Sequence, residues 1–390
     1  MCIRDRYYAN QLVDDFLNIL PSEQVHLFPV DEVLSAEMAF SSPEARADRV
    51  SALNFLMTAN AGIVVVPVAG LRKYLPTKET WQNAQLHWEI GTEVEPEILA
   101  QRLVLMGYER QSMVGKPGEF SIRGSIVDVY PLNAEYPVRV ELFDVEIDSI
   151  RYFEADTQRS LENLEEVTIS PMTDLVFSKA DMNHGMTRLQ DALEKRLATA
   201  KDQTETDFLE EYFGQLLSSW EQGIPTENAH YYTDFLYQQK TTLLDYLPEN
   251  SLLFVDDYSR MMETEREIAR EEAEWQTLKI EEMRVFSEQT FGVDFHDQLR
   301  KTARNTTFFS LFQKGMGNLR FQEVHNFQYR SMQQFFGQMP LLKAEVDRWQ
   351  KQNQTVVVFV PTKERIQKVE ELFQDFDIPS VVSNWDQLLD

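Results

Sequence analysis

FSIRGSIVDVY (Phe120 to Tyr130), VRVELF (Val138 to Phe143) and EIDSIRYF (Glu146 to Phe153) are three segments in which apolar and polar residues alternate. A period of two is typical of strands that bury one face. Short connections rich in turn-forming residues separate the segments. They therefore predict three antiparallel strands of a small β domain, with Val167 to Ser170 as a candidate fourth strand.

The second of these strands has an unusual outer face. Alternation places the aliphatic residues of 138–143 on one face and Arg139, Glu141 and Phe143 on the other. Arginine and aromatic residues are enriched at binding hot spots. If the first two strands form a hairpin, Arg123 lies on the strand next to Phe143. We therefore predict a partner-binding site at Arg123, Arg139 and Phe143; in the alternative, Phe143 packs under a flanking helix and the arginines are only solvated.

Sequence on both sides of the β segments has α/β character. Bulky runs at Gln24 to Phe28 and Ile63 to Val68 suit buried parallel strands, and Ser42-Pro43 suits the start of a helix. Helical spacing returns after residue 180, and Ser251 to Asp257 is a further strand. Four parts are predicted, namely the two halves of a split α/β domain (1–95 and 176–335), an inserted β-rich domain (96–175) and the start of a small α/β domain (336–390).

One further helix and the order of elements in the last part are also predicted. An acidic, mixed-charge helix is expected over residues 261–284 and is interpreted as a solvated face. In the last part, a helix from Pro340 to Gln350 precedes a strand from Thr355 to Val360 and a helix capped at Thr362.

Composition restricts the possible functions. The formal net charge of −27 over 390 residues disfavours tight nonspecific binding to a phosphate backbone. A single cysteine, Cys2, excludes an internal disulfide framework and a cysteine zinc cluster. The sequence contains neither a membrane-spanning apolar run nor a secretory signal at its start. We expect a cytoplasmic protein without membrane contact.

Motifs for catalysis are missing from the sequence. Gly115-Lys116 lacks the remaining residues of a phosphate loop, because Arg110 and Pro117 occupy two required positions. The histidines form no ligand pair, so neither a metal nor a cofactor is expected. The strand ending in Asp256 and Asp257 has the form of a magnesium-binding strand end, but without a phosphate loop it is expected to be only the remnant of a nucleotide site.

A long, ordered block of sequence carries a family resemblance. It runs through 108–110, 117–131, 138–151 and 157–160, and it resembles a block shared by the bacterial transcription-repair coupling factors (Mfd) and the excision-repair helicase UvrB. Where UvrB ends a strand in Asp-Glu-Ser-His, this chain has Asp256-Asp257-Tyr258-Ser259. Pro29 to Ser42 lacks the tyrosine-rich hairpin of UvrB. Both departures favour the coupling factors.

The resemblance implies a fold and a partner. It implies a degenerate, UvrB-like domain related to the P-loop NTPases, split by a β-rich domain that binds the repair protein UvrA. The family's UvrA contacts fall here on Arg123, Arg139 and Phe143. RNA polymerase and double-stranded DNA are implied as partners only of parts beyond this chain, where the family's translocase lies. The alternatives are a fragment of a UvrB-type ATP-dependent helicase and a module that mainly shields the translocase.

The resemblance also predicts a gap at the start of the chain. Residues 1–6 match nothing in the family, so the strand that opens the first α/β domain is expected to be absent. An incomplete sheet exposes an unpaired edge. Lower stability and aggregation of the isolated chain are therefore expected.

Overall fold

The computed structural model describes residues 2–3, 6–30, 42–58, 61–224, 226, 228–310, 319–327, 334–335, 337–360 and 362–383. Two compact units result, Met1–Asn318 and Leu319–Asp390. Most of Pro29 to Ser42, the segment expected to lack the UvrB hairpin, lies outside the described residues, which omit 31–41.

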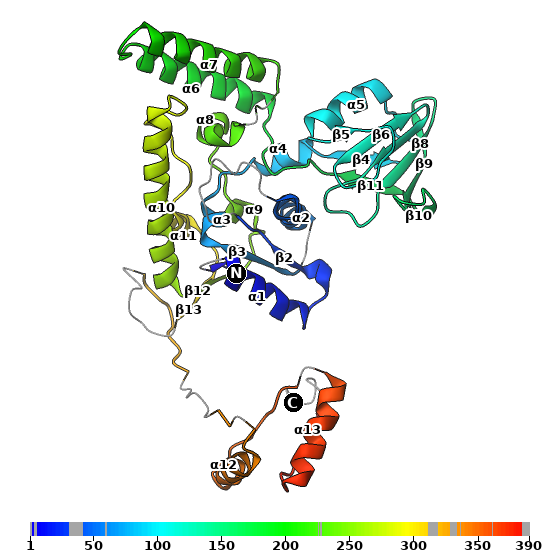
Figure 1. Ribbon diagram of the computed structural model, residues 1–390, viewed down its shortest axis with the longest axis vertical. Helices are drawn as coiled ribbons and strands as arrows, with labels where there is room; N and C mark the ends of the chain where they lie inside the picture. Colours follow the sequence, from blue (N-terminus) through cyan, green and yellow to red (C-terminus); the bar gives the residue numbers. More distant parts are fainter. Residues whose placement is uncertain are drawn as a thin grey trace. The chain divides into compact units, whose positions relative to one another are not determined.

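The first unit contains a five-stranded parallel sheet in the order β13-β12-β1-β3-β2. Its strands are β1 (Cys2–Ile3), β2 (Val25–Leu27), β3 (Ile63–Pro67), β12 (Leu253–Asp256) and β13 (Thr306–Phe309). Helices α1 (Arg6–Leu17) and α2 (Pro43–Thr58) lie on opposite sides of β2 and β3 (Figure 1). The sheet is therefore doubly wound, and the chain reverses its direction across the sheet at β1.

The expected gap in this sheet is filled. β1 pairs with both neighbours, with Cys2 opposite Val66 and Val255 and Ile3 opposite Pro67. The expectation that no strand opens the domain is therefore wrong. Because sheet pairing requires only backbone groups, two residues are enough to take this position.

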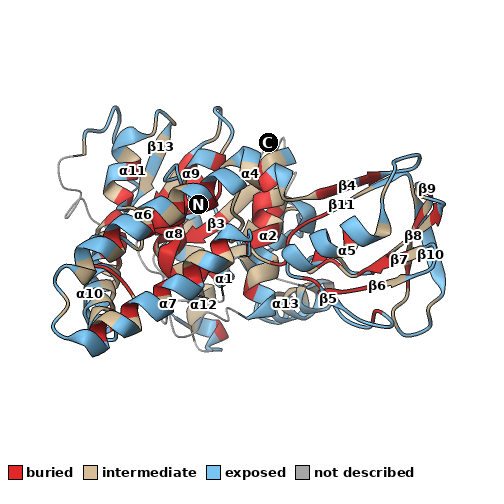
Figure 2. Cartoon of the chain, turned by 90° about the horizontal axis from the view of Figure 1, so that it is seen from above, coloured by how far each residue is buried: buried red, intermediate tan, exposed pale blue. Residues whose placement is uncertain are grey.

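The β-rich part contains a six-stranded sheet in the order β10-β9-β8-β7-β6-β5. Helix α5 (Pro96–Leu105) packs on one face through buried Leu99 and Leu103 (Figure 2). The strands are β5 (Glu109–Arg110), β6 (Glu119–Arg123), β7 (Ile126–Val129), β8 (Val138–Phe143), β9 (Glu146–Phe153) and β10 (Ser160–Leu164).

The segment expected as one strand, Phe120 to Tyr130, is in fact a hairpin. β6 and β7 pair antiparallel around Gly124, whose φ of 61° suits a tight turn. Both arms alternate with the same period, so alternation alone did not reveal the reversal. Arg123 therefore lies two strands away from Phe143, with β7 between them, and not on the neighbouring strand.

A separate two-stranded sheet lies beside this domain. β4 (Leu86–Glu89) pairs with β11 (Glu166–Ile169), and Leu86 and Ile169 join the same apolar core as α5. The predicted strand near residues 167–170 is therefore present, but its partner is β4. Structure that belongs with the β-rich part thus begins before residue 96.

A polar network connects the β-rich part to α2. Asp174 is fully buried and pairs with Arg49 at 2.9 Å and Lys73 at 2.6 Å. Burial alone would raise the pKa of Asp174, but the two cations outweigh it and hold the pKa well below its usual range. Nearby, the Asn54 amide donates to the Ser170 hydroxyl at 2.8 Å.

Helices complete the first unit. An aromatic core that includes Phe213, Trp220 and Tyr232 joins α6 and α7 to the shorter helices. The helices are α3 (Val68–Arg72), α4 (Lys78–Asn83), α6 (Lys179–Leu197), α7 (Gln203–Glu221), α8 (Thr233–Leu236), α9 (Leu243–Tyr246), α10 (Tyr258–Glu281) and α11 (Phe295–Lys301), with 3-10 turns at Ser22–Gln24 and Ala229–Tyr232. The long α10 covers most of the acidic helix predicted at 261–284 but ends earlier, at Glu281 (Figure 1).

The second unit consists of helices α12 (Met339–Lys351) and α13 (Lys363–Asp375) around a small core of Met339, Val346 and Ile378. As predicted, the Thr362 side chain caps α13. The predicted strand at residues 355–360 forms no ladder among the described residues, and Phe359 is 68% exposed. Apolar residues alone do not make a strand, because its backbone groups need a neighbouring strand to pair with.

A candidate partner-binding face on the β domain

Four strands of the six-stranded sheet align polar residues in one row. Ser121 on β6 pairs with Asp128 on β7, Asp128 with Arg139 on β8, and Arg139 with Arg151 on β9. Side chains in such a row point to the same side of the sheet. Because α5 and the apolar core cover the opposite side, this face is the outer one.

Asp128 is the centre of the outer face. Its side chain is 0% exposed, yet it is an acid in an otherwise apolar strand. Arg123 Nη2 donates to Asp128 Oδ2 at 2.6 Å. Arg139 donates from Nε to Oδ1 at 2.6 Å and from Nη2 to Oδ2 at 2.9 Å. One buried carboxylate thus joins both predicted arginines through charge-assisted hydrogen bonds.

The three predicted residues differ in exposure. Phe143 is 77% exposed, and the side chains of Arg123 and Arg139 are 42% and 11% exposed. The alternative in which Phe143 packs under a helix is therefore wrong. Leu142 N donates to Ser125 O at 2.8 Å, so Phe143 projects beside the β6–β7 turn.

Arg139 is enclosed by several groups besides Asp128. Its Nη2 donates to Gln158 Oε1 at 2.7 Å, and its guanidinium carbon lies 4.2 Å from the centroid of the Phe153 ring. Gln158 in turn donates to the carbonyl oxygens of Val114 and Ala155. Flanking loops therefore cover the Arg139 end of the face, while the end at Arg123 and Phe143 is open.

A second ion pair adjoins the open end. Glu141 stands opposite Ser149 and accepts a hydrogen bond from Arg151, which lies on the same strand as Ser149. This hydrogen bond holds the pKa of Glu141 below its usual range. The pair is half-buried and neutral overall, so it adds no net charge beside Arg123.

The other predicted residues, Asp256 and Asp257, lie at the carboxyl end of β12. Burial raises the pKa of Asp256, Asp257 raises it further, and a hydrogen bond from Tyr8 opposes the rise. Asp257 has a φ of 48° and caps α10 through the backbone N–H of Arg260. Only two residues connect β1 to α1, which is too few for the eight-residue phosphate loop.

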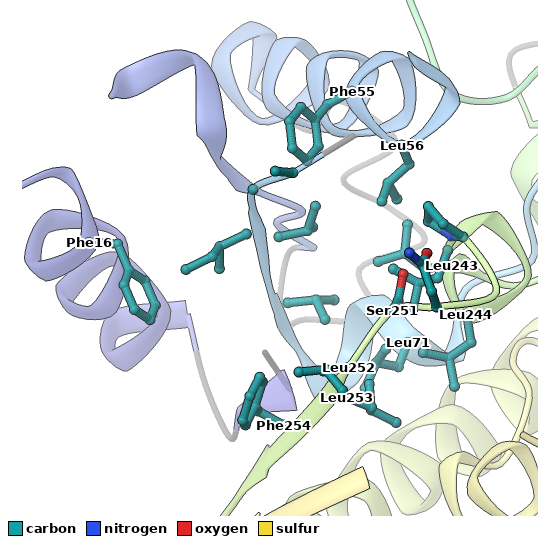
Figure 3. A pocket seen from close by; sticks show the side chains of 18 of the residues that line it. Phe16, Phe55, Leu56, Leu71, Leu243, Leu244, Ser251, Leu252, Leu253 and Phe254 are labelled. Carbon is teal, nitrogen blue, oxygen red and sulfur yellow. The ribbon is translucent and has the colours of Figure 1, made fainter. Parts of the chain in front are cut away.

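An apolar cavity lies within the described part of the first unit. It has a volume of about 640 Å³ and is lined by residues of α1, α2, β3 and β12, including Phe16, Phe55 and Phe254 (Figure 3). The lining that the described residues provide holds no titratable side chain. The cavity therefore offers no acid or base, and the hydroxyl in its described lining is that of Ser251.

Within the described ranges, no cluster of three or more His, Cys, Asp or Glu side chains is arranged to hold a metal ion. No helix in the same ranges combines the length and apolarity needed to cross a membrane.

Sequence reasoning missed Asp128, Gln158 and Phe153 as members of the outer face. A signal for Asp128 was present, because a lone acid between Val127 and Val129 interrupts an apolar strand. Gln158 gave no such signal, since only the loop after β9 brings it to Arg139, and Phe153 was recognised only as the last residue of a predicted strand.

Comparison with known proteins agrees with this architecture. The UvrB interaction domain matches residues 86–175, which include β4 and β11. The transcription-repair-coupling factor of Bacillus subtilis (strain 168) is 38% identical over 378 residues, covering 97% of this chain and 32% of the relative. That of Staphylococcus aureus (strain bovine RF122 / ET3-1) is 31% identical, covering 96% and 32%.

The match extends over nearly all of this chain but only about a third of each relative's length. It includes the block of sequence around β6 to β9 on which the resemblance rested. The chain therefore belongs to the transcription-repair-coupling factors and carries their UvrB interaction domain.

Proposed function

We propose that this chain is an adaptor that binds UvrA through the open end of the outer face. The observation that carries the proposal is the pairing of an aromatic ring that is 77% exposed, Phe143, with the half-exposed Arg123. Phe143 fills an apolar recess of UvrA, and Arg123 pairs with an acidic group beside it.

Family membership supports this choice of partner. The matched domain is named for interaction in the UvrB system, and the relatives are coupling factors by name. In the whole protein, the adaptor brings UvrA to RNA polymerase stalled at DNA damage in the cytoplasm. Contacts with RNA polymerase and DNA, and ATP-driven translocation, belong to parts of the relatives outside this chain.

The chain itself is proposed to have no catalytic site. Asp256 and Asp257 lie next to each other without a phosphate loop, and Asp257 serves as the cap of α10. We also retain the division into a split α/β domain (1–95 and 176–335), an inserted UvrA-binding domain (96–175) and a further small domain (336–390), with the inserted domain extended to include β4.

The experiment is calorimetric titration of UvrA with the chain and two double variants. Arg123→Ala with Phe143→Ala removes the open end without touching the enclosed Arg139. The matched control, Arg270→Ala with Phe327→Ala, removes an arginine that is 70% exposed and a phenylalanine that is 84% exposed elsewhere. We expect at least about a 30-fold loss of affinity for the first variant and none for the control.

Two results would contradict the proposal. If the folded parent does not bind UvrA, the adaptor function is wrong. If the parent binds and both double variants bind equally well, UvrA uses another surface of the chain.

A further inference from the structure

We infer that Asp128 is the positioning residue of the outer face: it holds Arg123 so that the remaining donors of this arginine meet a carboxylate of the partner. Arg139 fixes Asp128 in place. It acts through Asp128, without itself contacting the partner. The inference rests on the proposed function and assigns separate roles to residues that the sequence treated alike.

Charge balance supports the role of Asp128. Its carboxylate has no access to solvent, so it must be compensated within the fold. Arg123 and Arg139 supply two positive charges for this single negative one. The group therefore carries one net positive charge, on the surface of a chain whose net charge is −27. Such a site favours an anionic group on the partner.

Arg139 has little left to offer a partner. Two of its nitrogens bond Asp128, one of these also bonds Gln158, and the Phe153 ring covers the guanidinium. With 11% of its side chain exposed, it is enclosed on most sides. Its contribution is to fix Asp128, which then presents one oxygen to Arg123.

Arg123 is held at one end and open at the other. Its Nη2 bonds Asp128, and among the described residues no contact engages its Nε or Nη1. The guanidinium is a rigid planar fork, so fixing one nitrogen also orients the others. A carboxylate of the partner can then accept two parallel hydrogen bonds from an arginine that is already ordered. Ordering such a side chain before binding is worth about 3- to 10-fold in affinity.

The test is a double-mutant cycle on UvrA affinity. Asp128→Asn keeps the size and one acceptor oxygen but removes the charge that holds Arg123. We expect it to lower affinity about 10-fold in the parent and to have no further effect in the Arg123→Ala background. Asp191→Asn, on the exposed surface of α6, makes the same change in net charge and should leave affinity unchanged.

The cycle separates positioning from a general structural role. A structural role predicts the same loss with or without Arg123, because the whole face would be disturbed. Equal losses in both backgrounds would therefore overturn the inference, as would unchanged affinity in a folded Asp128→Asn variant. Failure of the parent to bind UvrA would instead contradict the proposed function.

A second variant covers the case in which Asp128→Asn does not fold. Arg123→Lys keeps the positive charge but cannot bond Asp128 and a partner carboxylate as one rigid fork. We expect it to lose affinity about 10-fold, nearly as much as Arg123→Ala. Affinity within about 2-fold of the parent would show that charge alone suffices and would overturn the inference.

Discussion

Two acidic residues on strands of this chain, Asp128 and Asp256, differ in their charged neighbours. On the outer face, Asp128 is completely buried but carries three hydrogen bonds from two arginines. At the end of β12, Asp256 is only partly buried, yet its pKa is raised by burial and by Asp257. The more deeply buried acid is thus the one with better compensation.

The difference shows how a charged site becomes useful to a partner. Two cations around one acid leave a fixed positive group at the surface, ready for an anionic ligand. Two adjacent acids with one nearby arginine, Arg260, leave a local excess of negative charge, and Asp257 caps α10. The number of arginines relative to the number of acids therefore separates the two positions.

Among the variants considered, Arg139→Ala should lower stability most. It therefore tests most sharply whether buried Asp128 depends on its arginines. It leaves the buried Asp128 with Arg123 as its only cation and removes the guanidinium from the Phe153 ring. We expect the free energy of unfolding of the β-rich part to fall by about 3 kcal/mol, as measured by urea denaturation. A loss below that of Asp257→Ala would contradict the claimed dependence of Asp128 on its partners.

Phe143→Ala tests the same face without disturbing the fold. Because the ring is 77% exposed, its removal should leave the unfolding free energy nearly unchanged. UvrA affinity should fall about 30-fold, which corresponds to about 2 kcal/mol. Phe327→Ala, at 84% exposed, should change neither quantity. If Phe143→Ala lowers stability but not UvrA affinity, the claim that Phe143 binds the partner is wrong.

Asp257→Ala tests the acidic position at the end of β12. Alanine loses the cap of α10 and is strained at a φ of 48°, so stability should fall by about 1 kcal/mol. Asp257→Asn should retain most of the parent's stability, because asparagine caps helices and tolerates this backbone conformation. Thermal melting of both variants checks that Asp257→Asn is more stable than Asp257→Ala. Any change in UvrA affinity would assign this position a role in binding that it is not expected to have.

The smallest effect is expected from Asp256→Asn. The folded state raises the pKa of Asp256, so the ionised carboxylate destabilises the fold at pH values above that pKa. Asparagine removes this penalty and still accepts the hydrogen bond from Tyr8. The variant should therefore melt about 1 °C higher than the parent at pH 7. The difference should vanish as the pH falls toward about 4; a lower melting temperature at pH 7 would contradict the assigned pKa shift.

Alternation along β8 predicted the outward direction of Phe143 correctly. The same pattern predicted Arg139 as a second partner-binding residue on that face. Alternation reports the face of a strand but not what covers that face. The loops that bring Val114 and Gln158 over Arg139 are distant along the chain from β8. The separate roles of the two arginines therefore depended on tertiary contacts.

Other elements also show that local sequence patterns do not determine strand pairing. The turn at Gly124 was hidden because β6 and β7 share one period, although the glycine itself marks a turn. The apolar run at 355–360 predicted a strand that no described neighbour pairs with. β1, in contrast, forms from residues without any strand pattern, because its two neighbours supply the backbone partners.

The most direct measurement is photo-crosslinking from position 143. A benzoylphenylalanine placed there in the full chain, irradiated in the presence of UvrA, should form a covalent product with UvrA. The same group at position 327 should form none, although the ring is equally accessible. A product from position 143 alone would support the outer face as the binding surface. Its absence in a chain that still binds UvrA would contradict the account.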